Sequence, residues 1–343
     1  MTKVARLLIT GAGGYIGTTL VELALGKGYE VIALDRFFFG EDLLEEFASN
    51  PKFSTTKKDI RDLRADDLAG VDVVVDLAAL SNDPSGELDP DLTTSINHRG
   101  RVHVAEISRA AGIARYILAS SCSVYGFGET SELTEKSPTN PLTEYARSTF
   151  DAERAVIAMG DADFCVSALR NATVYGLSKR MRFDLVVNTM TRNAIDSGKI
   201  TVAGGGNQWR PLIHVRDVAR AILNIAAQPA EKVNKQVFNI GGENQKIRCL
   251  AFAVRENLPF QVTIEVEPDN DDKRSYNVSF DKARSVLGFE PKYDVPFAVR
   301  EIYEAVKAGV VDLGARTVTV DWYKRLLKAE QLVDATRLNG RML

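Results

Sequence analysis

The sequence predicts an α/β fold in which a doubly wound parallel sheet is joined to a smaller, interleaved α/β lobe. Strand-like and helix-like segments alternate through the first half of the chain with short connections, as βαβ units require. The segment VDVVVDLAA (71–79) is apolar enough to be buried on both faces of a sheet. A glycine-rich turn separates the first strand from the first helix, which is typical of sheets that bind a ligand at the carboxyl ends of their strands.

Each expected element follows from its local pattern. Short apolar runs that end at polar or glycine-containing turns predict strands, and apolar residues at helical spacing predict helices. The first and the last of the expected helices end at glycine, as helices often do. The expected strands are 5–10, 29–35, 52–60, 71–79, 114–121 and 163–171, and the expected helices between them are 15–28, 91–112 and 141–160.

The second half of the chain is less regular, because helices alternate there with short strands. An apolar stripe at Trp322, Leu326, Leu327 and Val333 predicts a packed C-terminal helix. The expected domains are 1–172 plus about 211–240 for the sheet, about 173–210 plus 241–312 for the smaller lobe, and 313–343 for a helical tail.

Composition excludes several classes of function. The 343 residues include 43 Lys and Arg against 46 Asp and Glu, a net charge of -3, so the basic excess typical of nucleic-acid or membrane-surface binding is missing. Three cysteines without a C-x-x-C pattern and three scattered histidines favour reduced thiols and argue against a metal site. The N-terminal segment has no signal-peptide pattern, and no apolar run is long enough to span a bilayer. We therefore expect a cytoplasmic protein.

The turn LLITGAGGYIGTTL carries the first functional signal. Gly11, Gly14 and Gly17 allow a tight turn, a close approach of the backbone to a pyrophosphate, and close packing of the helix on the sheet. The phosphates would lie at a helix N-terminus, which favours negative charge. Asp35 ends the next strand and would accept the hydroxyls of the adenosine ribose, which favours NAD over NADP, whereas Arg36 leaves room for a 2′-phosphate. The pattern predicts a Rossmann-type domain with NAD as the cofactor.

Taken in order, the motifs of the chain resemble those of the extended short-chain dehydrogenase/reductase family, and specifically its nucleotide-sugar epimerases, dehydratases and reductases. Each motif is loose by itself, whereas the ordered set is specific. The matching segments are TGAGGYIG (10–17), LD (34–35), KKDIRD (57–62), DLAAL (76–80), SINHRG (95–100), SSCSVYG (120–126), YARST (145–149), RNATVYG (170–176), RPLIHVRDVARAI (210–222) and DKRSYNVSFDKAR (272–284).

The resemblance implies a role for individual residues. Tyr145 would be the catalytic acid/base, and Ser121 would hydrogen-bond the reacting sugar hydroxyl. Arg210 and Arg274 would clamp a nucleotide diphosphate, for which arginine forks are suited. The other implied substrate contacts are Ser81, Ser121, Ser123 and Asn171. The implied cofactor contacts are Gly11, Gly14, Tyr15, Ile16, Gly17, Asp35, Arg36, Asp59, Ile60, Leu77, Ala78, Ala79, Tyr145 and Asn97, the last as a structural asparagine.

Three departures from the family pattern bear on the chemistry. Thr149 stands where the family has a lysine that lowers the pKa of the tyrosine and binds the nicotinamide ribose. Cys122 and Ser123 stand where 4,6-dehydratases have an Asp-Glu pair, which disfavours a dehydratase. Thr173 replaces an asparagine of many members. Thr149, Cys122 and Ser123 are candidate catalytic positions, although a small buried thiol is the simpler interpretation of Cys122.

The leading hypothesis is an NAD-dependent nucleotide-sugar epimerase that oxidises a sugar hydroxyl, at C4, to a keto intermediate and reduces it again. A 4-keto-sugar reductase that consumes NAD(P)H is the alternative, because Tyr145 would then only donate a proton. A catalytically silent NAD(H)-binding protein, or an enzyme whose lysine was replaced by Thr149 to trap a substrate complex, is also open. The expected partners are a nucleotide-diphosphate sugar and a second copy of the chain, in a homodimer formed by the helices at 91–112 and 141–160.

Overall fold

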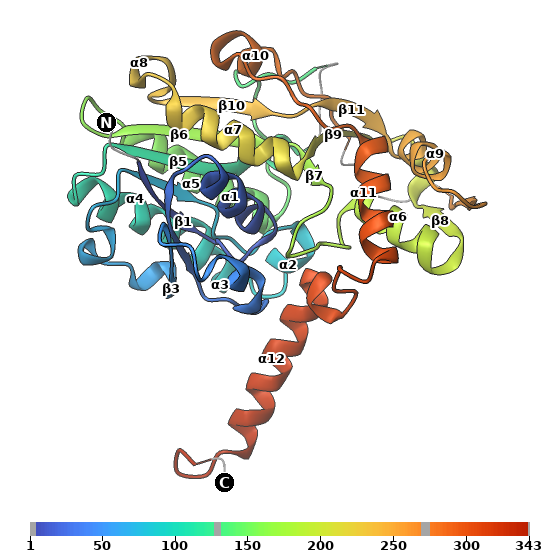
Figure 1. Cartoon of the computed structure of the whole chain (residues 1–343), viewed down its shortest axis with the longest axis horizontal. Coiled ribbons are helices and arrows are strands. Elements are labelled where there is room, and N and C mark those ends of the chain that lie inside the picture. Colours follow the sequence, from blue (N-terminus) through green and yellow to red (C-terminus); the bar gives the residue numbers. More distant parts are fainter. Residues whose placement is uncertain (1–4, 127–131, 269–274, 342–343) are drawn as a thin grey trace.

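A seven-stranded parallel sheet forms the centre of the protein (Figure 1). The computed structural model describes residues 5–126, 132–268 and 275–341. The strands lie in the order β10-β6-β5-β4-β1-β2-β3, and all neighbours pair in parallel, which confirms the predicted fold class. Their bounds are β1 (Arg6–Thr10), β2 (Glu30–Asp35), β3 (Phe53–Lys57), β4 (Val73–Asp76), β5 (Arg115–Ser121), β6 (Cys165–Asn171) and β10 (Gln236–Ile240).

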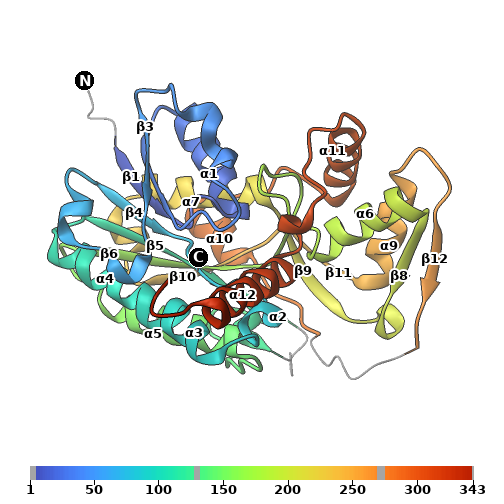
Figure 2. The ribbon, with the colours of Figure 1, turned by 90° about the horizontal axis from the view of Figure 1, so that it is seen from below.

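Helices cover both faces of this sheet (Figure 2). Helices α1 (Tyr15–Gly26) and α7 (Val215–Ala227) pack on one face, and α4 (Arg101–Ala110) and α5 (Glu144–Ala158) pack on the other. Successive strand residues point to opposite faces. Leu7 and Ile9 of β1 therefore belong to the first core, and Leu8 belongs to the second. Burial on both faces explains why these strands are continuous apolar runs.

Two elements differ in detail from the sequence expectation. The third strand ends at Lys57 rather than residue 60, because the Asp59 side chain accepts the backbone N–H of Arg61 at 2.9 Å and starts a helical turn. The expected helix 91–112 is a helical stretch of three parts: α3 (Pro90–Thr94), a π-helical segment (Ser95–Gly100) and α4. Such π-helical insertions are frequent at functional sites.

The second half of the chain adds two small sheets beside the main one. Strands β7 (Thr173–Tyr175), β9 (Trp209–His214) and β11 (Glu243–Lys246) form one sheet, and β8 (Lys199–Val202) pairs with β12 (Thr263–Val266). Along the chain, β10 follows β9 and precedes β11, yet it belongs to the main sheet whereas they belong to the small one. The two halves therefore interleave. The exact division of the chain into domains stays a prediction. The helices of this half include α6 (Val186–Ser197), α8 (Ala230–Val233), α9 (Ile247–Glu256), α10 (Asp281–Leu287) and α11 (Val295–Lys307). The short helix α2 (Asp83–Gly86) lies in the first half.

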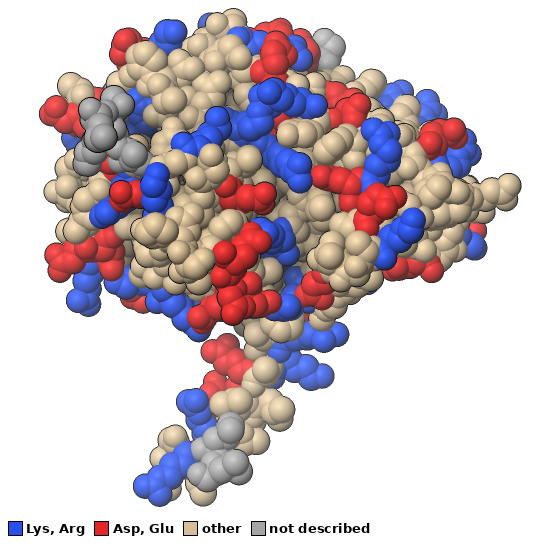
Figure 3. All heavy atoms as spheres, viewed as in Figure 1, with Lys and Arg blue, Asp and Glu red and all other residues tan. Residues whose placement is uncertain are grey.

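The C-terminal helix α12 (Thr319–Thr336) projects from the body of the protein as an arm (Figures 1 and 3). Among its residues only Thr319 is buried, so the helix packs through its first turns and not along the whole predicted stripe. The Trp322 indole donates to the carbonyl of Phe38 at 2.7 Å, which attaches α12 to the loop after β2. Figure 3 shows acidic and basic side chains interspersed over this face. None of the helices in the described ranges has the length and apolar character to cross a membrane.

Candidate functional site

A cavity of about 680 Å³ opens at the carboxyl ends of the parallel strands, where sheets of this kind bind ligands. Its walls come from the segments that follow β1, β2, β4, β5 and β6, and from the smaller lobe. Most of the residues that the sequence singled out therefore meet in one place. Those that line the cavity are Gly11, Gly14, Tyr15, Ile16, Gly17, Asp35, Arg36, Asp59, Ile60, Leu77, Ala78, Ala79, Ser81, Ser121, Ser123, Tyr145, Asn171, Thr173 and Arg210.

The glycine turn is packed too tightly for side chains. Gly11 has φ +68°, and a Cβ there would lie 2.8 Å from the backbone nitrogen of Ala78. A Cβ on Gly17 would lie 2.2 Å from the carbonyl oxygen of Gly11. Gly14 caps α1 without a side-chain hydrogen bond, so the first N–H groups of the helix are left for a ligand. The turn therefore fits the pyrophosphate of a dinucleotide.

Charged side chains form the end of the cavity next to β2 and β3. The Asp35 carboxylate accepts the backbone N–H groups of Gly13 at 3.0 Å and Phe37 at 2.6 Å. Burial raises the pKa of Asp35, and these hydrogen bonds oppose that shift. Arg36 Nη1 lies 3.2 Å from Asp59 Oδ2. A hydrogen bond from Arg61 lowers the pKa of Asp59, which keeps its carboxylate ionised. This end of the cavity offers acceptors for ribose hydroxyls.

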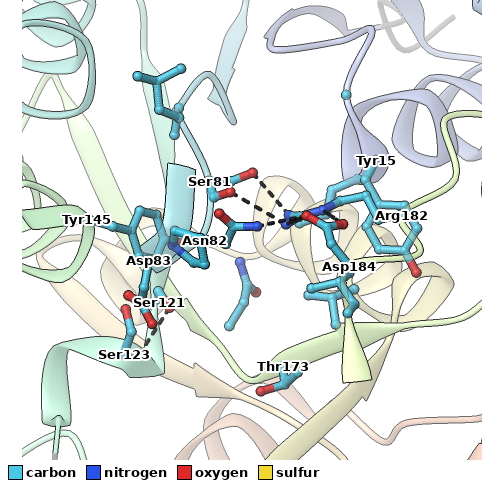
Figure 4. A pocket seen from close by; sticks show the side chains of 18 of the residues that line it. Tyr15, Ser81, Asn82, Asp83, Ser121, Ser123, Tyr145, Thr173, Arg182 and Asp184 are labelled. Carbon is cyan, nitrogen blue, oxygen red and sulfur yellow. Dashed lines mark hydrogen bonds and ion pairs between the residues drawn. The ribbon is translucent and has the colours of Figure 1, made fainter. Parts of the chain in front are cut away.

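The candidate catalytic pair lies on the opposite wall from a buried ion pair, as Figure 4 shows. Tyr145 stands in the first turn of α5, Ser121 ends β5, and both residues line the cavity. Burial raises the pKa of Tyr145 above its usual value, whereas Ser121 lowers it and the charge of Asp83 raises it further. The raised pKa means that Tyr145 is protonated at neutral pH.

At the position of the family lysine, the shorter side chain of Thr149 does not line the cavity. Thr149 is 1% exposed and lies outside the cavity lining, and its hydroxyl oxygen has no hydrogen-bond partner among the described residues. Two arginines lower the pKa of Tyr145 electrostatically instead, namely Arg101 and Arg182. Each of them is held by a carboxylate: Arg101 by Asp76 at 3.2 Å, and Arg182 by Asp184 at 2.9 Å. Their charges are therefore partly offset at the tyrosine.

Three further sequence candidates take other places. Cys122 does not line the cavity; its thiol is buried in the core and donates to the carbonyl of Arg170 at 3.2 Å. Burial raises the pKa of Cys122 far above its usual range, so a role for it in substrate chemistry is not supported. Asn97 also lies outside the lining, because its amide bonds both backbone groups of Leu80, at 2.8 and 3.0 Å. It orients the loop after β4 rather than contacting the cofactor. Arg274 lies outside the described residues.

A polar network that was not predicted from the sequence closes the cavity opposite Tyr145. Arg182 donates to Ser81 Oγ at 3.0 Å, and Asn82 donates to Asp184 at 2.8 Å (Figure 4). The run KRMRFD (179–184), which begins three residues after the end of the RNATVYG motif, was a signal for this network. Tyr323 of α12 also lines the cavity, but no motif in the sequence indicated that it would. The missed lining residues include Asn82, Asp83, Thr143, Arg101, Arg180, Arg182, Asp184, Gln208, Val320 and Tyr323.

Comparisons with known proteins agree with this geometry. The chain matches the NAD dependent epimerase/dehydratase family over residues 7–241. It is 31% identical over 299 residues to a UDP-glucose 4-epimerase of Mycolicibacterium smegmatis, with 84% of this chain and 94% of that protein covered. It is 29% identical over 302 residues to UDP-glucuronic acid decarboxylase 1 of Arabidopsis thaliana, with 84% and 67% covered. Among solved structures it resembles MoeE5 in complex with UDP-glucuronic acid and NAD, with a TM-score of 0.76, 26% identity, and 94% of this chain and 100% of that chain covered.

Proposed function

Because this chain belongs to the NAD-dependent epimerase/dehydratase family, we propose that it is a nucleotide-sugar epimerase acting at C4 of the sugar. The observation that carries the proposal is that Ser121 and Tyr145 lie on one wall of a cavity whose other half fits a dinucleotide (Figure 4). Positions 122 and 123 hold a buried thiol and a hydroxyl, which lack the proton-transfer capacity of a dehydratase Asp-Glu pair. The likeness to a UDP-glucose 4-epimerase supports the same reaction.

In this proposal Tyr145 moves the proton and Ser121 holds the oxygen. Bound NAD+ would supply the redox step by taking a hydride from the sugar carbon and returning it. Tyr145 would accept the proton of the sugar hydroxyl at its phenol oxygen and later return it. Ser121 would donate a hydrogen bond to the sugar oxygen as it becomes a carbonyl.

Other side chains in the cavity are suited to hold the substrate. Ser123 Oγ, Asn171 Oδ1 and Gln208 Oε1 are buried cavity-lining atoms without a hydrogen-bond partner among the described residues. Buried polar atoms are normally hydrogen-bonded, so these atoms are candidates to bind sugar and nucleotide hydroxyls. Arg210 on β9 is the candidate for the diphosphate of the substrate.

A reductase of 4-keto nucleotide sugars is the second candidate, and the raised pKa of Tyr145 favours it. A tyrosine that is protonated at neutral pH can donate a proton to a keto oxygen without help from a lysine. In an epimerase the same tyrosine must first lose its proton, which the electrostatics around Tyr145 favour only weakly.

The test is a panel of UDP-, dTDP-, GDP- and CDP-sugars, together with 4-keto nucleotide sugars, incubated with the protein and NAD+ or NADH. An epimerase converts a sugar to its C4 epimer, for example UDP-glucose to UDP-galactose, with no net change in NADH absorbance. A reductase consumes one NADH for each product formed. Loss of carbon dioxide from UDP-glucuronic acid, or NAD binding with every sugar unchanged, would contradict both candidates.

A homodimer formed through the helical stretch 90–110 and α5 stays a prediction. Light scattering on the eluted protein should give the mass of two chains, and a mass of one chain would count against it.

A further inference from the structure

Arg180 is a buried arginine that the family motifs do not explain. It lies in the loop between β7 and α6, is 4% exposed, and lines the cavity. Its Nη2 donates to Thr319 Oγ1 at 2.9 Å, and its guanidinium lies 3.7 Å from the centroid of the Phe39 ring. Its Nε is buried and has no hydrogen-bond partner in the described part of the chain. The side chain is held in place, yet one of its donors is left open.

No carboxylate of the described residues lies within ion-pair distance of Arg180, although Asp184 acts on its charge from further away. The neighbours of Arg180 in the loop are each paired, Lys179 with Glu46 and Arg182 with Asp184. Burial, and next the charge of Arg182, lower the pKa of Arg180 to about 9. A buried charge without a counter-ion is costly, and proteins retain one where a ligand supplies the opposite charge.

The surroundings of Arg180 belong to the cofactor half of the cavity. Phe39, under its guanidinium, lies in the loop after β2 and also lines the cavity. The positive charge of Arg180 lowers the pKa of Asp35 at the end of β2. Tyr15, in the first turn of α1, raises the pKa of Arg180. Ser178, two residues before Arg180 in the same loop, donates to the carbonyl of Tyr15 at 2.7 Å, so this loop lies against the first turn of α1.

We propose that Arg180 binds the pyrophosphate of the dinucleotide, as a second anion contact beside the N-terminus of α1. An arginine fork suits a diphosphate, because its N–H groups match two phosphate oxygens. The substrate carries a diphosphate too, but Arg210 on β9 of the smaller lobe is the candidate for that group. This inference concerns the cofactor, which the whole family shares, and does not depend on the epimerase reaction.

The C-terminal helix contributes to this contact. Thr319, the first residue of α12, is 1% exposed and accepts the hydrogen bond from Arg180. Tyr323, one turn further, packs against Phe39 with ring centroids 5.7 Å apart and lines the cavity. The start of α12 therefore fixes both the arginine and the aromatic ring beneath it.

The experiment is calorimetric titration of the full chain and of R180L with NAD+, ADP-ribose, adenosine and UDP. Because charge-assisted hydrogen bonds are stronger than neutral ones, we expect R180L to lower the affinity for NAD+ and for ADP-ribose by about 10- to 100-fold. Adenosine, which has no phosphate, should bind as before, and UDP should change by less than about twofold on the same reasoning. The matched control is R192L, since Arg192 also stacks on a phenylalanine, Phe183, at 5.1 Å but lies outside the cavity lining.

Unchanged binding of ADP-ribose by R180L would overturn the proposal. If R180L binds UDP more weakly but binds ADP-ribose with unchanged affinity, Arg180 contacts the substrate diphosphate instead, and the proposal is overturned as well. If R180L does not fold, R180K keeps the charge without the fork and should weaken ADP-ribose by an intermediate factor, whereas adenosine binding stays constant. Equal ADP-ribose affinities of R180K and the unchanged protein would then count against the fork.

Discussion

Glu153 Oε1 lies 2.6 Å from Arg170 Nη2, and this buried ion pair joins the helix that carries Tyr145 to the strand that ends at Asn171. The two side chains are 3% and 6% exposed. Ser120, next to Ser121, donates to the same carboxylate at 2.6 Å. The carboxylate of Glu153 therefore links α5 to both β5 and β6. These three elements carry the candidate catalytic wall.

Substituting Glu153→Gln should strongly destabilise the protein. The change leaves the Arg170 charge buried without its counter-ion, and breaking such a pair costs about 3–5 kcal/mol of unfolding free energy. Denaturant unfolding measures the effect. The control is Glu265→Gln, because Glu265 pairs with Lys199 at 2.8 Å on the surface, where loss of a pair costs below about 1 kcal/mol. Equal losses in the two variants would show that the buried pair does not hold this wall.

Substituting Thr149→Lys should raise turnover and shift its pH dependence. Burial raises the pKa of Tyr145 above its usual value of about 10, so the ionised form is scarce at neutral pH. An epimerase rate that needs tyrosinate should therefore rise with pH into the alkaline range. A lysine cation lowers the pKa of Tyr145, and each unit gives about tenfold more tyrosinate below that pKa. The rise should then begin at lower pH.

Rate profiles of the two forms against pH decide the point, with Tyr145→Phe as the inactive control. If Thr149→Lys leaves turnover unchanged while Tyr145→Phe abolishes it, the missing charge does not limit the reaction. A reductase would show the opposite slope, because its rate would fall as pH rises through the pKa of Tyr145.

Removing the hydroxyl of Thr149 should not destabilise the protein. Its oxygen is buried and without a partner among the described residues, so Thr149→Val should leave the unfolding free energy unchanged or raise it by about 1–3 kcal/mol. Thr191 is a matched buried threonine in α6, and its hydroxyl donates to the carbonyl of Val187 at 2.8 Å. Thr191→Val should lose about 1 kcal/mol. A larger loss at Thr149 than at Thr191 would reveal a contact of the Thr149 hydroxyl that this structure does not contain.

Substituting Gly17→Ala should remove NAD binding. The added methyl group would lie 2.2 Å from the carbonyl oxygen of Gly11, so the glycine turn must open. In the same helix, a Cβ on Gly26 would meet nothing within 4 Å, so Gly26→Ala is the control and should bind NAD normally. Titration of both variants with NAD+ checks this. Normal affinity in Gly17→Ala would mean that the turn does not form the cofactor site.

The residues that line the cavity beside β1 and β2 were predictable because their signals are local. Glycine spacing, a strand that ends at Asp35 and a following helix all lie within one βαβ unit, and the fold required only that such units repeat. Cys122 was a candidate catalytic position because it stands between Ser121 and Ser123. The turn after β5 directs its thiol into the core instead. Sequence adjacency does not specify which of three neighbouring side chains faces a cavity.

The wall opposite Tyr145 was not predictable, because it depends on long-range packing. Arg182 meets Ser81 across 101 positions, and Trp322 meets Phe38 across 284. Such contacts depend on how the smaller lobe and α12 pack against the main sheet. The spacing of apolar residues within one segment carries no information about that packing. The arginine-rich run 179–184 indicated charge near the site but not its partners.

The attachment of α12 to the loop after β2 has a consequence for how the protein matures. Residues 319–323 are synthesised after every other segment that lines the cavity. A nascent chain can complete the seven-stranded sheet before Thr319 and Tyr323 leave the ribosome, since β10 ends at Ile240. If Arg180 and the start of α12 hold the dinucleotide as proposed, its tight capture is a late event that follows completion of the sheet.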